Sequence, residues 1–222
     1  MTFYDRLISE TAKERESFLS IPLIQRVVHV GASRTLYVEF LRQAYHHVKH
    51  TFPLLARTAS FTTDERYQDA LVQYMAEERG HEKWILNDIR DLGVDENAVK
   101  EGEPGAACKI MVGYTYYAIE YVSPYAMLGS VHVLEGMSVL LAEKVATALK
   151  SSLGAQTSAG FSYLISHGSL DQTHTALFRT LVDGFDTPRI EQIVIDQSRL
   201  FYRLYGAIIH DLDGVSELDN AA

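Results

Sequence analysis

The chain has 222 residues, of which 47% are hydrophobic and 22% are charged, and its formal net charge is −9. This composition is ordinary for a globular protein with a substantial core, and the negative charge argues against nucleic acid or an anionic membrane as a partner. The single cysteine, Cys108, excludes an internal disulfide and a cysteine-based zinc site. We expect one domain over residues 1–222.

We expect neither a targeting signal nor a membrane segment. Residues 1–6 lack a basic stretch followed by an apolar one, so we expect no signal peptide. No run approaches the roughly 18 apolar residues that cross a bilayer. We therefore expect a cytoplasmic protein in a reducing environment, where both Fe(II) and Mn(II) occur.

Apolar residues recur at three- and four-residue spacing along nearly the whole chain, which predicts helices, and no two-residue alternation predicts a strand. The expected fold class is all-α, a bundle of about seven helices. Pro53 is expected to kink its helix because proline lacks a backbone donor. The expected helices cover residues 3–19, 22–30, 34–61, 64–92, 105–122, 124–153, 159–185 and 188–211, with one turn at 95–101 and a frayed tail at 214–222.

The segment 167–174 reads His-x3-Asp-x2-His, with His167, Asp171 and His174 as the members of the pattern. Positions i, i+4 and i+7 share one face of a helix, so two imidazoles and a carboxylate point the same way. Nitrogen and carboxylate ligands together suit non-haem iron. The alternative is a solvated polar face, and the spacing leaves both interpretations open.

A second pair of candidate ligands lies in the helix expected at 64–92. Glu78 and His81 are three residues apart, the spacing with which helix bundles project a Glu and a His inward. Glu77 and His81 are four apart and also share a face, so spacing does not choose between the two glutamates. The charged neighbours favour the alternative of a solvated acidic face.

Glu135 stands alone as a carboxylate in the apolar run 127–141. A buried unpaired carboxylate costs several kcal/mol, so we expect it to meet a metal, a cation or its own proton. The alternative is a glutamate on the exposed side of an amphipathic helix, but the surrounding apolar residues leave little room for a polar face. The small residues Gly129, Gly136 and Ser138 nearby indicate close helix packing or room for a cavity.

Three separate helices thus each contribute part of one ligand set. The set contains three histidines and three carboxylates. It suits a pair of iron or manganese ions, because the carboxylates balance the charge of two divalent ions. A metal-dependent redox enzyme is therefore the leading hypothesis.

The order Glu-x2-His, then Glu in a Leu-Glu-Gly segment, then His-x3-Asp-x2-His resembles the haem-oxygenase-like diiron oxidases over residues 34–211. The resemblance implies a seven-helix bundle with the haem-oxygenase-like fold, which is related to thiaminase II. It also implies one iron held by Glu78, His81 and His167 and a second iron held by Glu135, Asp171 and His174. Because the family varies in the spacing of its first glutamate, Glu77 stands as an alternative to Glu78.

The resemblance also implies a function. It is that of an O2-dependent non-haem diiron oxidase or oxygenase acting on a small organic substrate, such as an amino acid, a fatty acid or an amine. The implied cofactors are two Fe(II) ions, with manganese as the alternative metal, and O2 is the implied co-substrate. The resemblance favours a homodimer, and an electron donor is a further expected partner.

Three other functions stay open at this stage. A metal-free enzyme of the thiaminase II type would need a nucleophilic cysteine, for which Cys108 is the candidate. Haem oxygenase itself would need a haem-binding histidine in the first helix, but residues 3–19 contain none and His29 is the nearest substitute. The third alternative is a non-enzymatic helical bundle that binds a metal or a ligand.

Histidines outside the ligand set are weaker candidates. His46, His47 and His50 cluster in the helix expected at 34–61, and we predict that His47 and His50 border the substrate pocket or orient a metal ligand. His132 precedes Glu135 by three residues on nearly the same face, which makes it a further pocket candidate. A core histidine is the competing interpretation of His132.

Overall fold

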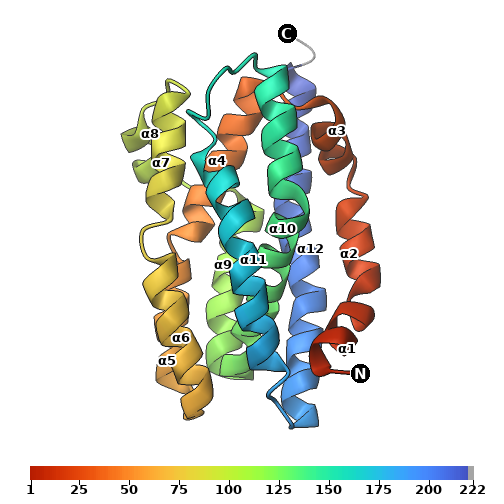
Figure 1. Cartoon of the computed structure of the whole chain (residues 1–222). Helices are drawn as coiled ribbons and strands as arrows, with labels where there is room; N and C mark the ends of the chain where they lie inside the picture. The colour runs from red at the N-terminus through yellow and green to blue at the C-terminus, as the bar shows by residue number, and fades with distance from the viewer. Residues whose placement is uncertain (220–222) are drawn as a thin grey trace.

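The computed structural model describes the backbone of residues 1–219 and the side chains of residues 1–168 and 174–214. Within this part of the chain the regular elements are all helices, which confirms the all-α class. The longer helices run side by side (Figure 1). The elements are α1 (Phe3–Glu10), α2 (Ala12–Leu19), α3 (Pro22–Val30), α4 (Arg34–Val48), α5 (Thr51–Phe61), α6 (Glu65–Glu78), α7 (Glu82–Asp91), α8 (Glu96–Glu101), α9 (Ala106–Tyr117), the π-helix η1 (Ala118–Val122), the 3-10 helix η2 (Pro124–Ala126), α10 (Met127–Ser152), α11 (Ser162–Val182) and α12 (Pro188–Asp219).

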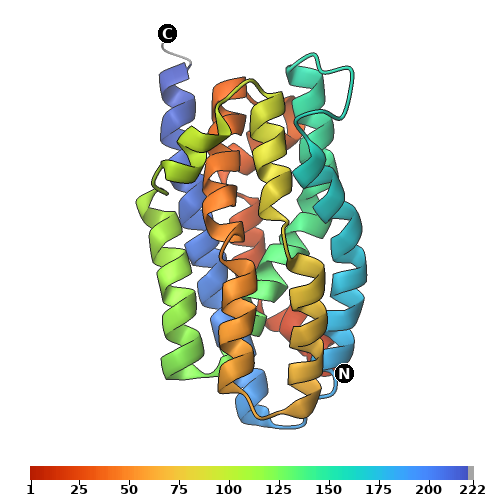
Figure 2. The same cartoon turned by 90° about the vertical axis from the view of Figure 1, so that its left-hand side faces the viewer.

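Several of the expected long helices are broken, so the described chain has more helices than the seven expected. The helix expected at 34–61 breaks at Lys49 and His50, between α4 and α5, and not at Pro53 itself. The proline ring crowds the carbonyl group four residues upstream, and in the first turn of α5 its missing N–H needs no partner. Figure 2 shows α4 and α5, in orange, stacked end to end along the bundle.

The break between α6 and α7 matters most for the candidate ligands. Glu78 is the last residue of α6, and His81 immediately precedes α7. Gly80 lies between them with a φ of 95°, a left-handed conformation that side chains other than that of glycine rarely adopt. The prediction of one continuous helix over 64–92 is therefore wrong, and Glu78 and His81 meet across a turn.

α10 is the central helix of the bundle and packs against α3, α11 and α12. At Gly129 the contact with α12 is so close that an added Cβ would lie 2.8 Å from the backbone nitrogen of Ser198. By length and composition the segment Pro124–Ser152 could cross a membrane. The prediction that no segment is apolar enough for this is therefore wrong. However, 56% of its most apolar window is buried inside the bundle, as expected for a core helix.

The start of α1 and the end of α12 lie towards opposite ends of the bundle (Figure 1). α1 and α2 pack along α12. α12 continues to Asp219, well beyond the end expected near residue 211 and through the start of the expected tail. Residues 220–222 lie outside the described part of the chain. That residues 1–222 form one domain stays a prediction.

Candidate metal centre

Glu78, His81 and His167 come together inside the bundle. One potential ligand atom from each residue lies within 4.8 Å of the other two. Nδ1 of His81 is 3.2 Å from Oε2 of Glu78, and the two side chains are only 5% and 11% exposed. The end of α6, the turn before α7 and the second turn of α11 thus assemble the three residues expected around the first iron.

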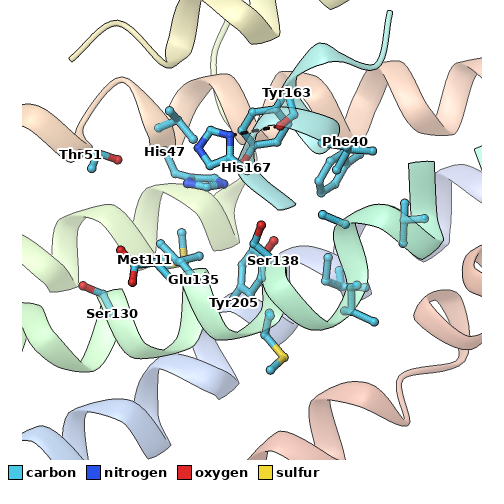
Figure 3. Close-up of a pocket in the computed structure, with 18 of the residues that line it drawn as sticks. Phe40, His47, Thr51, Met111, Ser130, Glu135, Ser138, Tyr163, His167 and Tyr205 are labelled. Atoms are coloured by element: carbon cyan, nitrogen blue, oxygen red, sulfur yellow. Dashed lines mark hydrogen bonds between the residues drawn. The ribbon is translucent and has the colours of Figure 1, made fainter. Parts of the chain in front are cut away.

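Neighbouring groups orient the two imidazoles of this group. Nδ1 of His167 lies 3.1 Å from the backbone carbonyl oxygen of Tyr163, to which it donates (Figure 3). This bond leaves Nε2 of His167 as the ligand atom. The indole of Trp84 stacks on His81, with ring centroids 4.0 Å apart. The sequence did not indicate Tyr163 or Trp84, although each lies three or four residues from the histidine that it contacts.

His174 and Glu135 extend the cluster towards a second group of ligands. Nδ1 of His174 lies 3.6 Å from Oε1 of Glu78 and 3.6 Å from Oε1 of Glu135. Glu78 therefore has one carboxylate oxygen beside His81 and the other facing His174. Asp171 is the remaining predicted ligand, and its side chain lies outside the described residues.

Glu77 occupies a different position from Glu78. Its Oε2 atom is 2.9 Å from Nε2 of His174, on the ring edge away from Glu78, and its side chain is 36% exposed. A carboxylate that accepts the Nε2 hydrogen leaves Nδ1 of His174 as the ligand atom. The geometry thus distinguishes two glutamates that spacing did not: Glu78 lies between the histidines, and Glu77 lies outside them.

The charges of the cluster fit a divalent cation. Among the ion pairs of the described residues, none joins Glu78 to a lysine or an arginine. Burial raises the pKa of Glu78, but His81, His167 and His174 lower it, and the net pKa is below its usual value. Nδ1 of His81 is buried, and its 3.2 Å contact with Oε2 of Glu78 lacks hydrogen-bond geometry. The buried, ionised carboxylate of Glu78 and the neighbouring imidazoles are a suitable donor set for iron or manganese.

A cavity of about 220 Å³, here called the apolar cavity, borders the cluster. Glu78, Glu135 and His167 line it, and most of its remaining wall consists of aliphatic and aromatic side chains from α3, α4, α10 and α12. Figure 3 shows Glu135 and His167 facing this space from opposite sides. The described residues that line it include no lysine and no arginine.

His47, a predicted pocket residue, also lines the apolar cavity. Burial, reinforced by His167, lowers the pKa of His47 to about 4, so its ring is neutral at pH 7. Tyr205 lies edge-on to it, with ring centroids 6.1 Å apart. Ser138 also borders the cavity, and its buried hydroxyl has no hydrogen-bond partner among the described residues. The sequence had indicated Ser138 as one of the small residues near a cavity, but no sequence signal had singled out Tyr205.

The other two pocket candidates lie elsewhere. Nδ1 of His50 is 3.1 Å from the hydroxyl oxygen of Tyr116, and His50 does not line the apolar cavity. His132 is buried between Phe178 and Tyr202, with centroid distances of 5.8 and 6.2 Å. It lines a separate cavity that also reaches Glu135.

The residues that two of the alternative functions would need are poorly placed. Cys108 is buried, its thiol donates to the carbonyl oxygen of Gln43 at 3.7 Å, and burial raises its pKa to about 11. Cys108 lines neither cavity. His29 is exposed on α3. These positions provide neither an activated thiolate nor a haem ligand beside the cluster.

Comparisons with known proteins agree with this architecture. The model of a family described as iron-containing redox enzymes matches residues 38–206. A domain of unknown function from Shewanella denitrificans, with a heme oxygenase-like fold, aligns with a TM-score of 0.87 at 24% identity over 98% of this chain and 94% of that chain. No curated protein matches the chain in sequence.

Two further solved structures have the same fold. Heme oxygenase-1 from Synechocystis, in complex with heme, aligns with a TM-score of 0.79 at 10% identity over 100% of this chain and 96% of that chain. A TenA homologue from Pseudomonas syringae aligns with a TM-score of 0.78 at 12% identity over 96% and 93%. At such identities the likeness shows the fold alone, and it confirms the haem-oxygenase-like fold.

Proposed function

Because this chain belongs to the family of iron-containing redox enzymes, we propose that it is an O2-dependent non-haem diiron oxidase or oxygenase that acts on a small organic substrate. The observation that carries the proposal is the position of Glu78, which has one carboxylate oxygen beside His81 and the other facing His174. A carboxylate between two histidine nitrogens is well placed to be shared by two neighbouring cations.

In this proposal three residues of the chain would hold each iron. When bound, ferrous iron supplies electrons for the reduction of O2, and manganese would suit the same donor atoms. The proposed ligands are Glu78, His81 and His167 for the first iron and Glu135, Asp171 and His174 for the second.

The chain itself orients the ligands and keeps water away. The carbonyl of Tyr163 and the carboxylate of Glu77 accept hydrogen bonds from the outer nitrogens of His167 and His174, so the inner nitrogens face the cluster. The side chains of His81 and His174 are only 5% and 3% exposed. Burial of this extent excludes bulk water from the proposed reaction site.

The apolar cavity favours some substrates over others. Its described walls offer no cation to a carboxylate, and they offer an ammonium group no carboxylate besides the proposed ligands. A free amino acid would therefore bury charges without partners, which is costly. An aliphatic or aromatic group, such as the chain of a fatty acid or of an apolar amine, suits these walls, with His47 as a neutral hydrogen-bonding neighbour.

Anaerobic loading with Fe(II) tests the proposal. We expect two irons per chain and a transient visible absorption after mixing with O2. His81→Ala should lower the iron content and abolish the absorption, because it removes a buried proposed ligand. His29→Ala is the matched control, since His29 is exposed on α3.

Two other outcomes would contradict the proposal. Iron uptake that His81→Ala does not change would mean that the cluster is not the metal site. Iron binding that raises thermal stability, with no change on adding O2, would instead support a non-enzymatic metal-binding bundle.

Three further expectations go with this function. An electron donor is needed to return the irons to the ferrous state after turnover. A homodimer and a cytoplasmic location also stay predictions. Light scattering coupled to size-exclusion chromatography measures whether the protein is a dimer.

A further inference from the structure

A second cavity, of about 240 Å³, borders Glu135 and is built from other parts of the bundle. α1, α2, α10, α11 and α12 form its walls. Val139 and Leu140 line it and are 39% and 42% exposed, so it reaches the surface of the molecule. Its lining includes a cation, Arg15, in contrast to that of the apolar cavity. We call it the arginine cavity.

Arg15 is half-buried and retains hydrogen-bonding capacity. Its Nη1 donates to the carbonyl oxygen of Ile8 at 3.2 Å, and the guanidinium is also hydrogen-bonded to the hydroxyl of Tyr202. A guanidinium has five N–H donors, so these two acceptors leave others for a ligand. Within the described residues no carboxylate lies at ion-pair distance from Arg15.

Two acidic residues near Arg15 in the chain, Glu10 and Glu14, are already paired with other arginines, and Glu135 is the carboxylate in the lining of the arginine cavity. Glu10 on α1 contacts Arg6 at 2.7 Å and Arg199 at 3.1 Å. Glu14, one residue before Arg15, lies 3.9 Å from Arg203. An arginine facing a cavity without a carboxylate partner is a suitable receptor for an anionic group.

The rest of the wall defines the kind of anion. Tyr4 and Tyr202 bring hydroxyl groups to the same cavity, and burial raises the pKa of both, that of Tyr202 to about 12, so both stay protonated at pH 7. Ile8, Leu140 and Phe178 form an apolar part of the wall. Such a wall suits the apolar body of an organic acid better than the water shell of inorganic phosphate.

We propose that the arginine cavity binds a small organic carboxylate, with the carboxylate on Arg15 and the apolar body against Ile8, Leu140 and Phe178. The bound acid would lie next to Glu135 and thus beside the metal centre of the proposed function. Its binding does not require iron, so the two proposals can fail independently.

Titration calorimetry with benzoate, butyrate and inorganic phosphate tests this site on the full-length chain, in a chelating buffer that prevents binding through a metal. We expect benzoate and butyrate to bind and phosphate to bind much more weakly. Arg15→Gln should weaken benzoate binding about tenfold or more, because a charge-assisted hydrogen bond is lost. Arg203→Gln is the control: it removes an equal charge from a side chain that is 72% exposed and does not line the cavity.

A second variant blocks the cavity without removing the charge. Gly136 lines it, and a Cβ added there would meet no atom within 4 Å, so Gly136→Leu should place its side chain in open space and abolish benzoate binding. Gly113→Leu on α9 is the control, since its Cβ also meets nothing within 4 Å and it lines neither cavity. The proposal is overturned by unchanged benzoate affinity in Arg15→Gln, by phosphate binding as tightly as benzoate, or by no carboxylate binding to the parent protein.

Discussion

The two cavities share Glu135 as a wall and differ in almost every other respect. The apolar cavity, between α3, α4, α10 and α12, offers neutral groups such as His47 besides the proposed metal ligands. The arginine cavity, beneath α1 and α2, combines a guanidinium with two tyrosine hydroxyls. One carboxylate on one helix thus borders two different chemical environments, because each neighbouring helix brings its own side chains to it.

Glu135→Gln removes the negative charge that both cavities share, and we expect the largest effect there. Iron affinity should fall by more than about 100-fold, since even the loss of an outer partner of a ligand costs about 10–100-fold. Benzoate should bind the arginine cavity more tightly, because a nearby like charge disappears. Iron quantification and calorimetry on the same variant measure both. Equal weakening of iron and benzoate would show that the cavities are not independent.

Each cavity is lined by one buried histidine that should make the stability of the protein depend on pH: His47 in the apolar cavity and His132 in the arginine cavity. Burial is the main cause that lowers the pKa of His47 and of His132 to about 4. Above about pH 6.5 both histidines are neutral in the folded and in the unfolded chain. Below this pH they become protonated in the unfolded chain but stay neutral in the folded chain. The free energy of unfolding should therefore fall as pH drops from 6.5 to 4, by on the order of 3 kcal/mol per histidine.

Chemical denaturation of the metal-free protein at several pH values measures this dependence. His47→Gln and His132→Gln should each reduce the slope between pH 6.5 and 4. His210→Gln is the control, because His210 is exposed. A slope that neither buried variant changes would contradict the assignment of low pKa values to these two rings.

Glu77→Gln tests the outer carboxylate. We expect iron affinity to fall about 10–100-fold, because the Nε2 hydrogen of His174 loses its ionised acceptor. Benzoate binding should be unchanged, because Glu77 lines neither cavity. Competition with a coloured iron chelator measures the affinity. A loss as complete as in Glu78→Gln would instead place Glu77 among the ligands.

Ser138→Ala affects the apolar cavity alone and has the smallest expected effect. The buried hydroxyl of Ser138 has no hydrogen-bond partner among the described residues, so its removal should stabilise the protein by about 1 kcal/mol. This corresponds to a rise of roughly 2–4 °C in the melting temperature of a chain of this size. Calorimetric melting measures the rise, and a lower melting temperature would show that the hydroxyl already has a stabilising partner.

Much of the fold could be predicted because helical periodicity is local. The regions of α3, α9, α10 and α11 agree well with the expected helices, and Glu135 was singled out by the apolar run around it. The breaks were harder to predict. A glycine such as Gly80 is tolerated inside many helices, so the sequence did not reveal that its φ is positive and that the helix ends there. Pro53 breaks the helix at the residues that precede it and not at its own position.

The sequence by itself determined the all-α class, the helical spacing of His167 and His174, and the anomaly of a carboxylate at Glu135, because each depends on residues close together in the chain. Only the tertiary structure decided that Glu78 lies between His81 and His174 while Glu77 lies outside, and that Arg15 faces a cavity without a carboxylate partner. The physical reason is that burial and pairing depend on distant segments. Whether a charged side chain is solvated, paired or left to bind a ligand follows from which helices pack around it.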